Sequence, residues 1–173
     1  INQQQTRRYE DEAWGGATNQ MDDRMAFLSG SFTFIIPLIE HIDEPIAVSW
    51  RVPPAWKVVT PWSAGARAVN IPSHYALVRN YYVAFEQGSV KTDRIRGIDL
   101  TTVWLGKDDI NDHTDAIFSI RRVVEAALSL FGEEATANKG SLTLIFRDSN
   151  ARNQFRASTE SNSIEFNFKK GVT

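Results

Sequence analysis

The sequence contains no cysteine among its 173 residues, which excludes disulfides, thiolate metal ligands and a thiol nucleophile. It also lacks an excess of one charge, because 19 Lys and Arg residues face 21 Asp and Glu residues. That balance argues against a basic nucleic-acid binder and against an acidic disordered tail. No apolar run approaches the roughly 20 residues that span a bilayer. We therefore expect a globular protein with neither a nucleic-acid partner nor a membrane span.

Composition leaves the cellular compartment and the oligomeric state open. The absence of cysteine is compatible with an exported or a cytosolic protein, and of these we favour a periplasmic or extracellular one. The first residues, Ile1–Arg8, are polar and unlike a signal peptide, so we expect that such a peptide either never existed or has been removed.

The chain length fits one domain, or one domain with a small appendage. We expect a polar tail over residues 1–24, a β-rich part over 25–62 and an α+β part over 63–173. The order of elements, many strands and then strand–helix–strand–strand, predicts the α+β class, with an antiparallel β-rich N-terminal part and one long helix on a sheet.

Alternating apolar residues bounded by proline or glycine predict the strands. The expected strands cover residues 25–37, 45–52, 56–60, 81–86, 94–105, 141–146 and 163–168. Within the fifth of these, Gly97 indicates a bulge. Residues 63–71 and 148–160 are expected to be loops, and Ser73 is expected to cap a short helix that ends near Asn80.

The helix expected over Thr114–Phe131 has the clearest periodicity in the chain. Its apolar residues follow the i, i+3, i+4 spacing of one buried stripe. The stripe consists of Ile117, Ile120, Val124, Ala127, Leu128 and Phe131. Gly132 stands where a left-handed residue commonly ends a helix. We expect this helix to lie across a sheet built from residues 98–105, 141–146 and 163–168.

Metal ligands and catalytic groups are sparse. The three histidines, His41, His74 and His113, lie far apart, and none belongs to an H-E-x-x-H motif. The sequence also has no G-x-S-x-G elbow around a nucleophilic serine. We therefore predict that this chain has no catalytic residues, no metal site and no cofactor.

An acidic segment before the long helix leaves one alternative open. It offers the hard oxygen ligands that calcium prefers, namely Asp108, Asp109, Asn111, Asp112 and Asp115. It lacks the glycine and the terminal glutamate of an EF-hand loop. We expect these residues to cap the helix rather than to bind calcium.

Three tryptophans flank a proline-rich hairpin, PPAWKVVTPW. Alternation places Trp50 on the face of Ile46 and Val48, so we expect at least two of Trp50, Trp56 and Trp62 to be largely buried in the core. The alternative is an exposed platform on which these three residues bind peptide or glycan.

Several short motifs follow one another in a familiar order. They are SGSFTFIIP, then WRVPPAWKVVTPW, PSHYALVRN with Asn80 where aspartate is usual, IDLTTVWLG, Leu130-Phe131-Gly132 and ASTESNSIEF. In this order they resemble the glycyl-aminopeptidase-like metallopeptidases, a thermolysin-related family, from about Met25 to Phe168. The resemblance implies a β-rich N-terminal domain followed by the start of a zinc catalytic domain.

The resemblance also assigns one binding residue. Glu160 occupies the position of the glutamate that holds a substrate's α-amino group in the family, with Ser158 and Thr159 where two glycines are usual; the alternative is a solvated loop glutamate. The family's H-E-x-x-H motif would lie beyond Thr173, so zinc is expected only in a longer parent protein.

These observations lead to two expectations about function. The first is a non-catalytic N-terminal fragment or scaffold of an aminopeptidase-like metallopeptidase, whose partner is the rest of the parent catalytic domain or a peptide. The second is an exported α+β binding module that holds peptide or glycan through the tryptophan hairpin.

Overall fold

A computed structural model describes residues 19–35, 43–106, 114–131, 140–149 and 155–169. The strands are β1 (Gln20–Met21), β2 (Met25–Ser29), β3 (Ile46–Ser49), β4 (Lys57–Thr60), β5 (Ser63–Ala64), β6 (Ala68–Ile71), β7 (Tyr81–Phe85), β8 (Gly88–Ile95), β9 (Ile98–Leu105), β10 (Ser141–Ser149), β11 (Phe155–Glu160) and β12 (Ser163–Lys169). The helices are α1 (Gly30–Thr33), α2 (His74–Val78) and α3 (Thr114–Phe131). None of these helices is long and apolar enough to cross a membrane.

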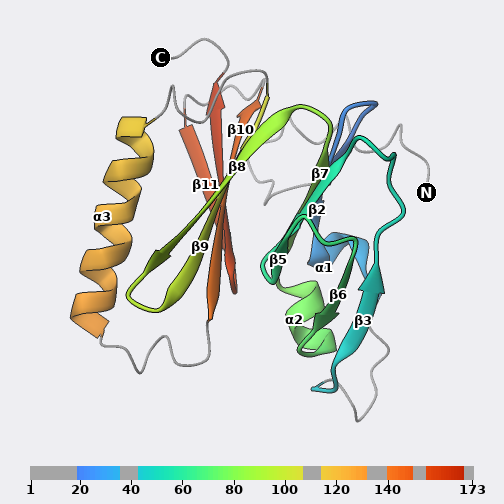
Figure 1. The fold of residues 1–173 in the computed structure, drawn as a ribbon, viewed down its shortest axis with the longest axis horizontal. Coiled ribbons are helices and arrows are strands. Elements are labelled where there is room, and N and C mark those ends of the chain that lie inside the picture. Colours follow the sequence, from blue (N-terminus) through green and yellow to red (C-terminus); the bar gives the residue numbers. More distant parts are fainter. Residues whose placement is uncertain (1–18, 36–42, 107–113, 132–139, 150–154, 170–173) are drawn as a thin grey trace.

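The elements stack in four layers (Figure 1). The two-stranded ribbon β3–β6 covers one face of an antiparallel sheet with the order β1-β2-β7-β4-β5. The other face of that sheet packs against a second sheet with the order β11-β12-β10-β9-β8. Helix α3 lies on the far side of the second sheet. This mixture of sheets and helices confirms the α+β class.

Strand alternation explains why the second sheet can bury both of its faces. On the face toward the first sheet, Val103, Leu105 and Ile145 form one apolar cluster with Phe27, Phe85 and their neighbours. On the opposite face, apolar residues of β9, β10 and β12 pack against α3. Successive side chains of a strand point to opposite faces, so the short apolar runs Val103-Trp104-Leu105 of β9 and Leu144-Ile145-Phe146 of β10 contribute to both layers.

Helix α3 spans the predicted residues, Thr114–Phe131. Its residues Ile117, Ile120, Val124 and Leu128 pack on the sheet formed by β9, β10 and β12, as expected. Ala127 is exposed, which corrects the predicted stripe: Leu128 occupies the buried position, and one residue of helix turns Ala127 away by about 100°. The side chain of Phe131 lies outside the described residues.

The prediction of one strand over residues 25–37 is wrong in its second half. Strand β2 ends at Ser29, and the chain makes the single turn α1 because Gly30 packs against the end of α2. The amide of Gly30 donates to the carbonyl oxygen of Asn80 at 2.8 Å. A contact between residues 50 positions apart therefore overrides the local strand pattern.

Replacing Gly30 with alanine is expected to lower the free energy of unfolding by about 1–3 kcal/mol, the usual cost of overpacking. A Cβ atom there would lie 2.3 Å from the carbonyl oxygen of Leu77 and 2.7 Å from that of Val78. Gly140→Ala is the control, because its Cβ would meet nothing within 4 Å. Urea melts that show the same stability for both variants would contradict this packing.

Three further expectations are also wrong, one about a strand and two about loops. The predicted single strand over 94–105 is a hairpin: β8 and β9 pair antiparallel, and the two turn residues Arg96 and Gly97 have positive φ values of 46° and 87°. Such a two-residue turn matches the twist of its strands. The loop expected over 63–71 contains β5 and β6, and the loop expected over 148–160 contains β11 and the end of β10.

The two boundaries predicted between the parts of the chain, after residues 24 and 62, both fall within the first sheet. Strand β1 lies in the predicted polar tail, and β4 from the predicted β-rich part pairs with β7 from the predicted α+β part. The short helix over 73–80 is confirmed as α2, and the Ser73 hydroxyl accepts a hydrogen bond from the Ala76 amide at 3.0 Å.

Candidate functional site

Glu160 lies where the two sheets meet. It ends β11, and the turn that follows it docks on the segment between α2 and β7. The Ser161 amide donates to the carbonyl oxygen of Arg79 at 2.9 Å. The Tyr81 amide donates to the Ser163 hydroxyl at 2.8 Å. Backbone and side-chain hydrogen bonds thus hold the turn in place on the first sheet.

Asn80 is the centre of this contact and is fully buried. Its Nδ2 donates to the carbonyl oxygen of Ala76, and its Oδ1 accepts from the Asn162 amide at 2.9 Å. A carboxylate could accept but not donate, so aspartate at this position would leave the Ala76 carbonyl oxygen without this bond. The amide therefore suits the contact that the structure builds here.

Glu160 itself is partly exposed. Burial raises the pKa of its carboxyl group above the usual 4.5, and the nearby Arg79 guanidinium opposes that rise. Arg79 is held by Tyr75: its Nη1 donates to the phenol oxygen at 2.7 Å, and its guanidinium lies 5.2 Å from the centre of the ring.

The Glu160→Gln variant is expected to gain stability relative to the natural chain as the pH rises from about 4 to about 7. A carboxyl group with a raised pKa in the folded state makes the fold less stable as it ionises, and this penalty builds up above pH 4.5. The measurement is the difference in urea midpoint at the two pH values. Glu86→Gln, at an exposed glutamate, controls for loss of a charge, and an equal pH dependence of both variants would contradict the burial of Glu160.

The tryptophan hairpin is closed by an arginine. The guanidinium of Arg67 donates to the carbonyl oxygens of Val52, Pro53, Pro54 and Trp56 at distances of 2.8 to 3.2 Å. These carbonyls belong to a segment whose two prolines cannot donate to a strand ladder. The charged contacts therefore fix the shape of a turn that has few backbone hydrogen bonds of its own.

The structure places all three predicted tryptophans against the core, but none is fully buried. Trp50 and Trp62 lie beside Tyr82, with ring centres 5.2 and 6.4 Å from its ring. Trp56 packs on the cluster that contains Val58. Trp50 shares the face of Ile46 and Val48, as alternation predicts. All three are therefore partly buried against the core, in agreement with the core placement expected for at least two of them.

Trp50 also lines a pocket of about 190 Å³ between the first sheet and the chain that follows β3. Its lining is apolar and includes Met21, Leu28 and Val52, with Arg51 as the charged member. Trp56 and Trp62 do not line it. The three tryptophans therefore do not share this one concave site.

The residues considered as metal ligands lie mostly outside the described residues. His41 and His113 do, and so do Asp108, Asp109, Asn111 and Asp112. His74 begins α2 and is partly buried, and Asp115 is exposed in the first turn of α3. Within the described part of the chain, no three His, Asp or Glu side chains gather closely enough to hold a metal ion. The absence of zinc and of calcium remains a prediction.

Sequence reasoning missed an ion pair within the second sheet that is buried where the first sheet covers it. The Arg147 guanidinium on β10 donates to the Glu165 carboxylate on β12 and to the side-chain oxygen of Gln20 on β1. It also lies 4.6 Å from the centre of the Phe27 ring on β2. Arg147 is 5% exposed and Glu165 is 0% exposed. In the sequence, Arg147 follows Phe146 and Glu165 stands between Ile164 and Phe166, so alternation alone assigns both ionisable residues to a solvent-facing side.

Comparison with known proteins places this fold. No protein-family model and no curated protein matches the chain. Among solved structures, the chain is similar to an aminopeptidase N family protein from Idiomarina loihiensis, with 18% sequence identity and a TM-score of 0.68. The match covers 90% of this chain and 28% of that one. The chain therefore shares its fold with somewhat more than a quarter of a longer aminopeptidase N family protein.

Proposed function

We propose that this chain is the non-catalytic N-terminal scaffold of an aminopeptidase-like zinc metallopeptidase. The observation that supports the proposal is the extent of the structural match. It takes in 90% of this chain, and therefore residues of both sheets, but only 28% of the longer protein. Such a scaffold needs no metal ligands of its own, because the rest of the parent domain would supply the zinc site.

Under this proposal, Glu160 is the residue of the scaffold that contributes to substrate binding. It lies at the junction of the sheets, where a turn fixed by Asn80 and Ser163 holds it. Its partly buried carboxylate can accept hydrogen bonds from a substrate's α-ammonium group. The chemistry of bond cleavage would belong to the zinc site of the parent domain.

The test begins with the natural reading frame that contains this chain. We expect it to continue past Thr173 into an H-E-x-x-H motif, and we expect the longer protein to bind zinc and to cleave aminoacyl p-nitroanilides. The Glu160→Gln variant of that protein should lose activity on substrates with a free α-amino group more than on N-acetylated ones. A frame without the motif, or a longer protein that binds no zinc, would show the proposal to be wrong.

The pocket beside Trp50 supports a second candidate, a binding module for peptides. A pocket of about 190 Å³ holds one aromatic or branched side chain, and the exposed Arg51 offers a cation to a nearby carboxylate. Trp50 packs one side of its ring on Tyr82, so we favour an apolar peptide side chain over a glycan as the ligand.

This second candidate is tested by following the indole N–H signals of the five tryptophans in NMR spectra. We expect a saturable shift of the Trp50 signal with N-acetyl-phenylalanine and little response to maltotriose. The Trp50→Phe variant assigns that signal. No shift at millimolar N-acetyl-phenylalanine would eliminate the peptide module, and a response to maltotriose alone would favour the glycan alternative.

A further inference from the structure

Helix α3 has a second apolar stripe that does not face the sheet. Three of its large apolar side chains are exposed, Phe118 at 59%, Val123 at 68% and Leu130 at 78%. Ala126, on the side of Val123 and Leu130, is exposed as well, whereas Phe118 lies roughly 120–140° around the helix from these two residues. Outward positions of a surface helix usually carry charged or polar residues. This pattern is therefore unusual for a helix whose outer side meets water.

The spacing of the outer residues defines the stripe. Ser119, Val123, Ala126 and Leu130 follow one another at intervals of four, three and four residues. At about 100° per residue, this stripe lies roughly 135° around the helix from the one that packs on the sheet. An α-helix that is apolar on both sides is typical of a position between two layers.

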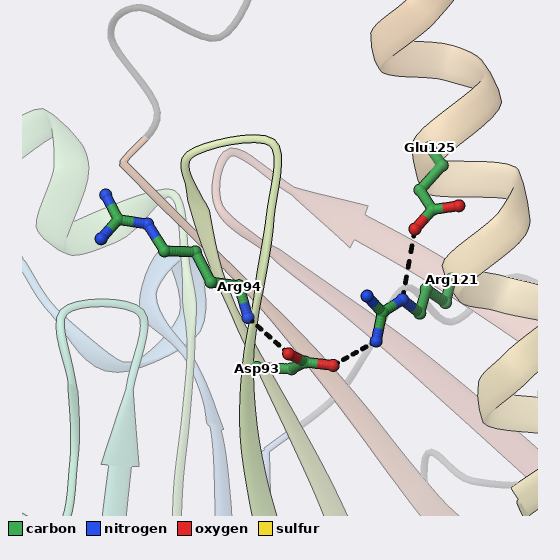
Figure 2. A network of polar contacts seen from close by, with 4 residues as sticks. All are labelled: Asp93, Arg94, Arg121 and Glu125. Atoms are coloured by element: carbon green, nitrogen blue, oxygen red, sulfur yellow. Dashed lines mark hydrogen bonds and ion pairs between the residues drawn. The ribbon is translucent and has the colours of Figure 1, made fainter.

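Two charged residues of α3, Arg121 and Glu125, lie on a flank away from this stripe, whereas the exposed Asp115 and Arg122 lie beside it. Figure 2 shows Arg121 between Asp93 of β8 and Glu125, one helical turn further along α3. The Arg121 Nε lies 3.2 Å from a Glu125 carboxylate oxygen. Asp93 also accepts a hydrogen bond from the Arg94 amide at 2.8 Å. These ion pairs tie α3 to the edge of the second sheet, on the side of the helix away from Val123 and Leu130.

The stripe fits another helix better than a second protein. Intervals of three and four residues form the seam along which two α-helices pack. A helix of 18 residues is about 27 Å long and about 10 Å wide, so the strip that it could bury is roughly 270 Å² per partner. A stable complex between separate molecules buries about 800 Å² on each side. A helix of the same polypeptide needs far less area, because the connection raises its effective concentration.

We propose that an amphipathic helix from the remainder of the longer protein packs on the outer stripe of α3. This inference rests on the proposed scaffold function, since it places a further layer of that protein on α3. The packed helix makes α3 the middle layer of a sheet–helix–helix arrangement, with Val123 and Leu130 at the contact.

These 173 residues contain no cysteine, so an introduced thiol is the only one among them, and any cysteine in the rest of the longer protein is replaced by serine in every variant. Leu130→Cys and Val123→Cys report on the stripe, and Lys91→Cys, at an exposed position of β8, is the matched control. In the 173-residue chain, all three thiols should react with a maleimide at rates within about threefold of one another. In the longer protein, the two stripe thiols should react at least about 20-fold more slowly, because labelling then requires local opening, whereas the control changes little.

The outcomes separate this inference from the proposed function. A longer protein that binds zinc and cleaves its substrates while the stripe thiols stay fully reactive overturns the docking of a helix and leaves the scaffold proposal intact. Protection in the 173-residue chain that grows with protein concentration identifies a second copy as the occupant and also overturns the inference. A reading frame without the expected continuation refutes both.

Discussion

Replacing Glu165 with alanine is expected to lower the free energy of unfolding by about 3–5 kcal/mol, because it leaves a buried guanidinium without its carboxylate. Arg147 is 5% exposed, and the first sheet covers it through Gln20 and Phe27. The measurement is the midpoint and slope of urea unfolding for the variant and the natural chain.

The double variant Arg147→Met/Glu165→Leu is the control for this experiment. It removes both charges and keeps apolar bulk at both positions, which often restores or exceeds the original stability. We expect it to be clearly more stable than Glu165→Ala. If Glu165→Ala unfolds within about 1 kcal/mol of the natural chain, the ion pair is not buried between the sheets as described.

The second large effect is expected at the helix. Leu128→Ala should lower the free energy of unfolding by about 2–5 kcal/mol, because it opens a cavity between α3 and the second sheet. Leu128 is 9% exposed and packs with Leu144, Phe146 and their neighbours. Ile120→Ala should act in the same direction, since Ile120 packs on the same cluster.

Leu130→Ala makes the same chemical change on the opposite side of the same helix. Leu130 is 78% exposed, so in the 173-residue chain this variant should change stability by no more than about 0.5 kcal/mol. Thermal and urea unfolding of the two leucine variants can be compared directly. Similar losses in both, or a loss below about 1 kcal/mol for Leu128→Ala, would contradict the placement of α3.

Local periodicity predicted the elements whose packing agrees with their own sequence. The helix over 114–131 and most strands appear where alternation or the 3.6-residue period placed them. The failures have two causes, a contact that is distant in sequence and a tight turn that the pattern did not reveal. Gly30 turns because α2 lies against it, and β8 is a strand because it pairs with β9 across a turn of Arg96 and Gly97. The partner of Gly30 lies far along the chain, outside any local window, whereas β9 follows β8 directly, and the expected bulge at Gly97 is in fact the turn between them.

The candidate site shows the same division. Glu160 was identified through motif resemblance, and its neighbours Arg79 and Asn80 belong to a segment about 80 residues earlier in the chain. Arg147 and Glu165 looked like ordinary polar positions, because a single sequence does not tell which face of a strand a second sheet will cover. Burial of a charge is a tertiary property, and it becomes visible only when both layers are placed.

The contacts between the β11–β12 turn and the first sheet also set an order of events during synthesis. The hydrogen bond from the Tyr81 amide to the Ser163 hydroxyl cannot form until Ser163, 82 residues later in the chain, has been made. At 5–20 residues per second, the ribosome needs about 4–16 s to make that stretch. During this interval every strand of the first sheet has already been made, while the second sheet that covers the apolar face of Phe27 and Phe85 is still incomplete. We therefore expect the nascent chain to depend on chaperones in that interval, and slow synthesis of residues 86–163 to promote its aggregation.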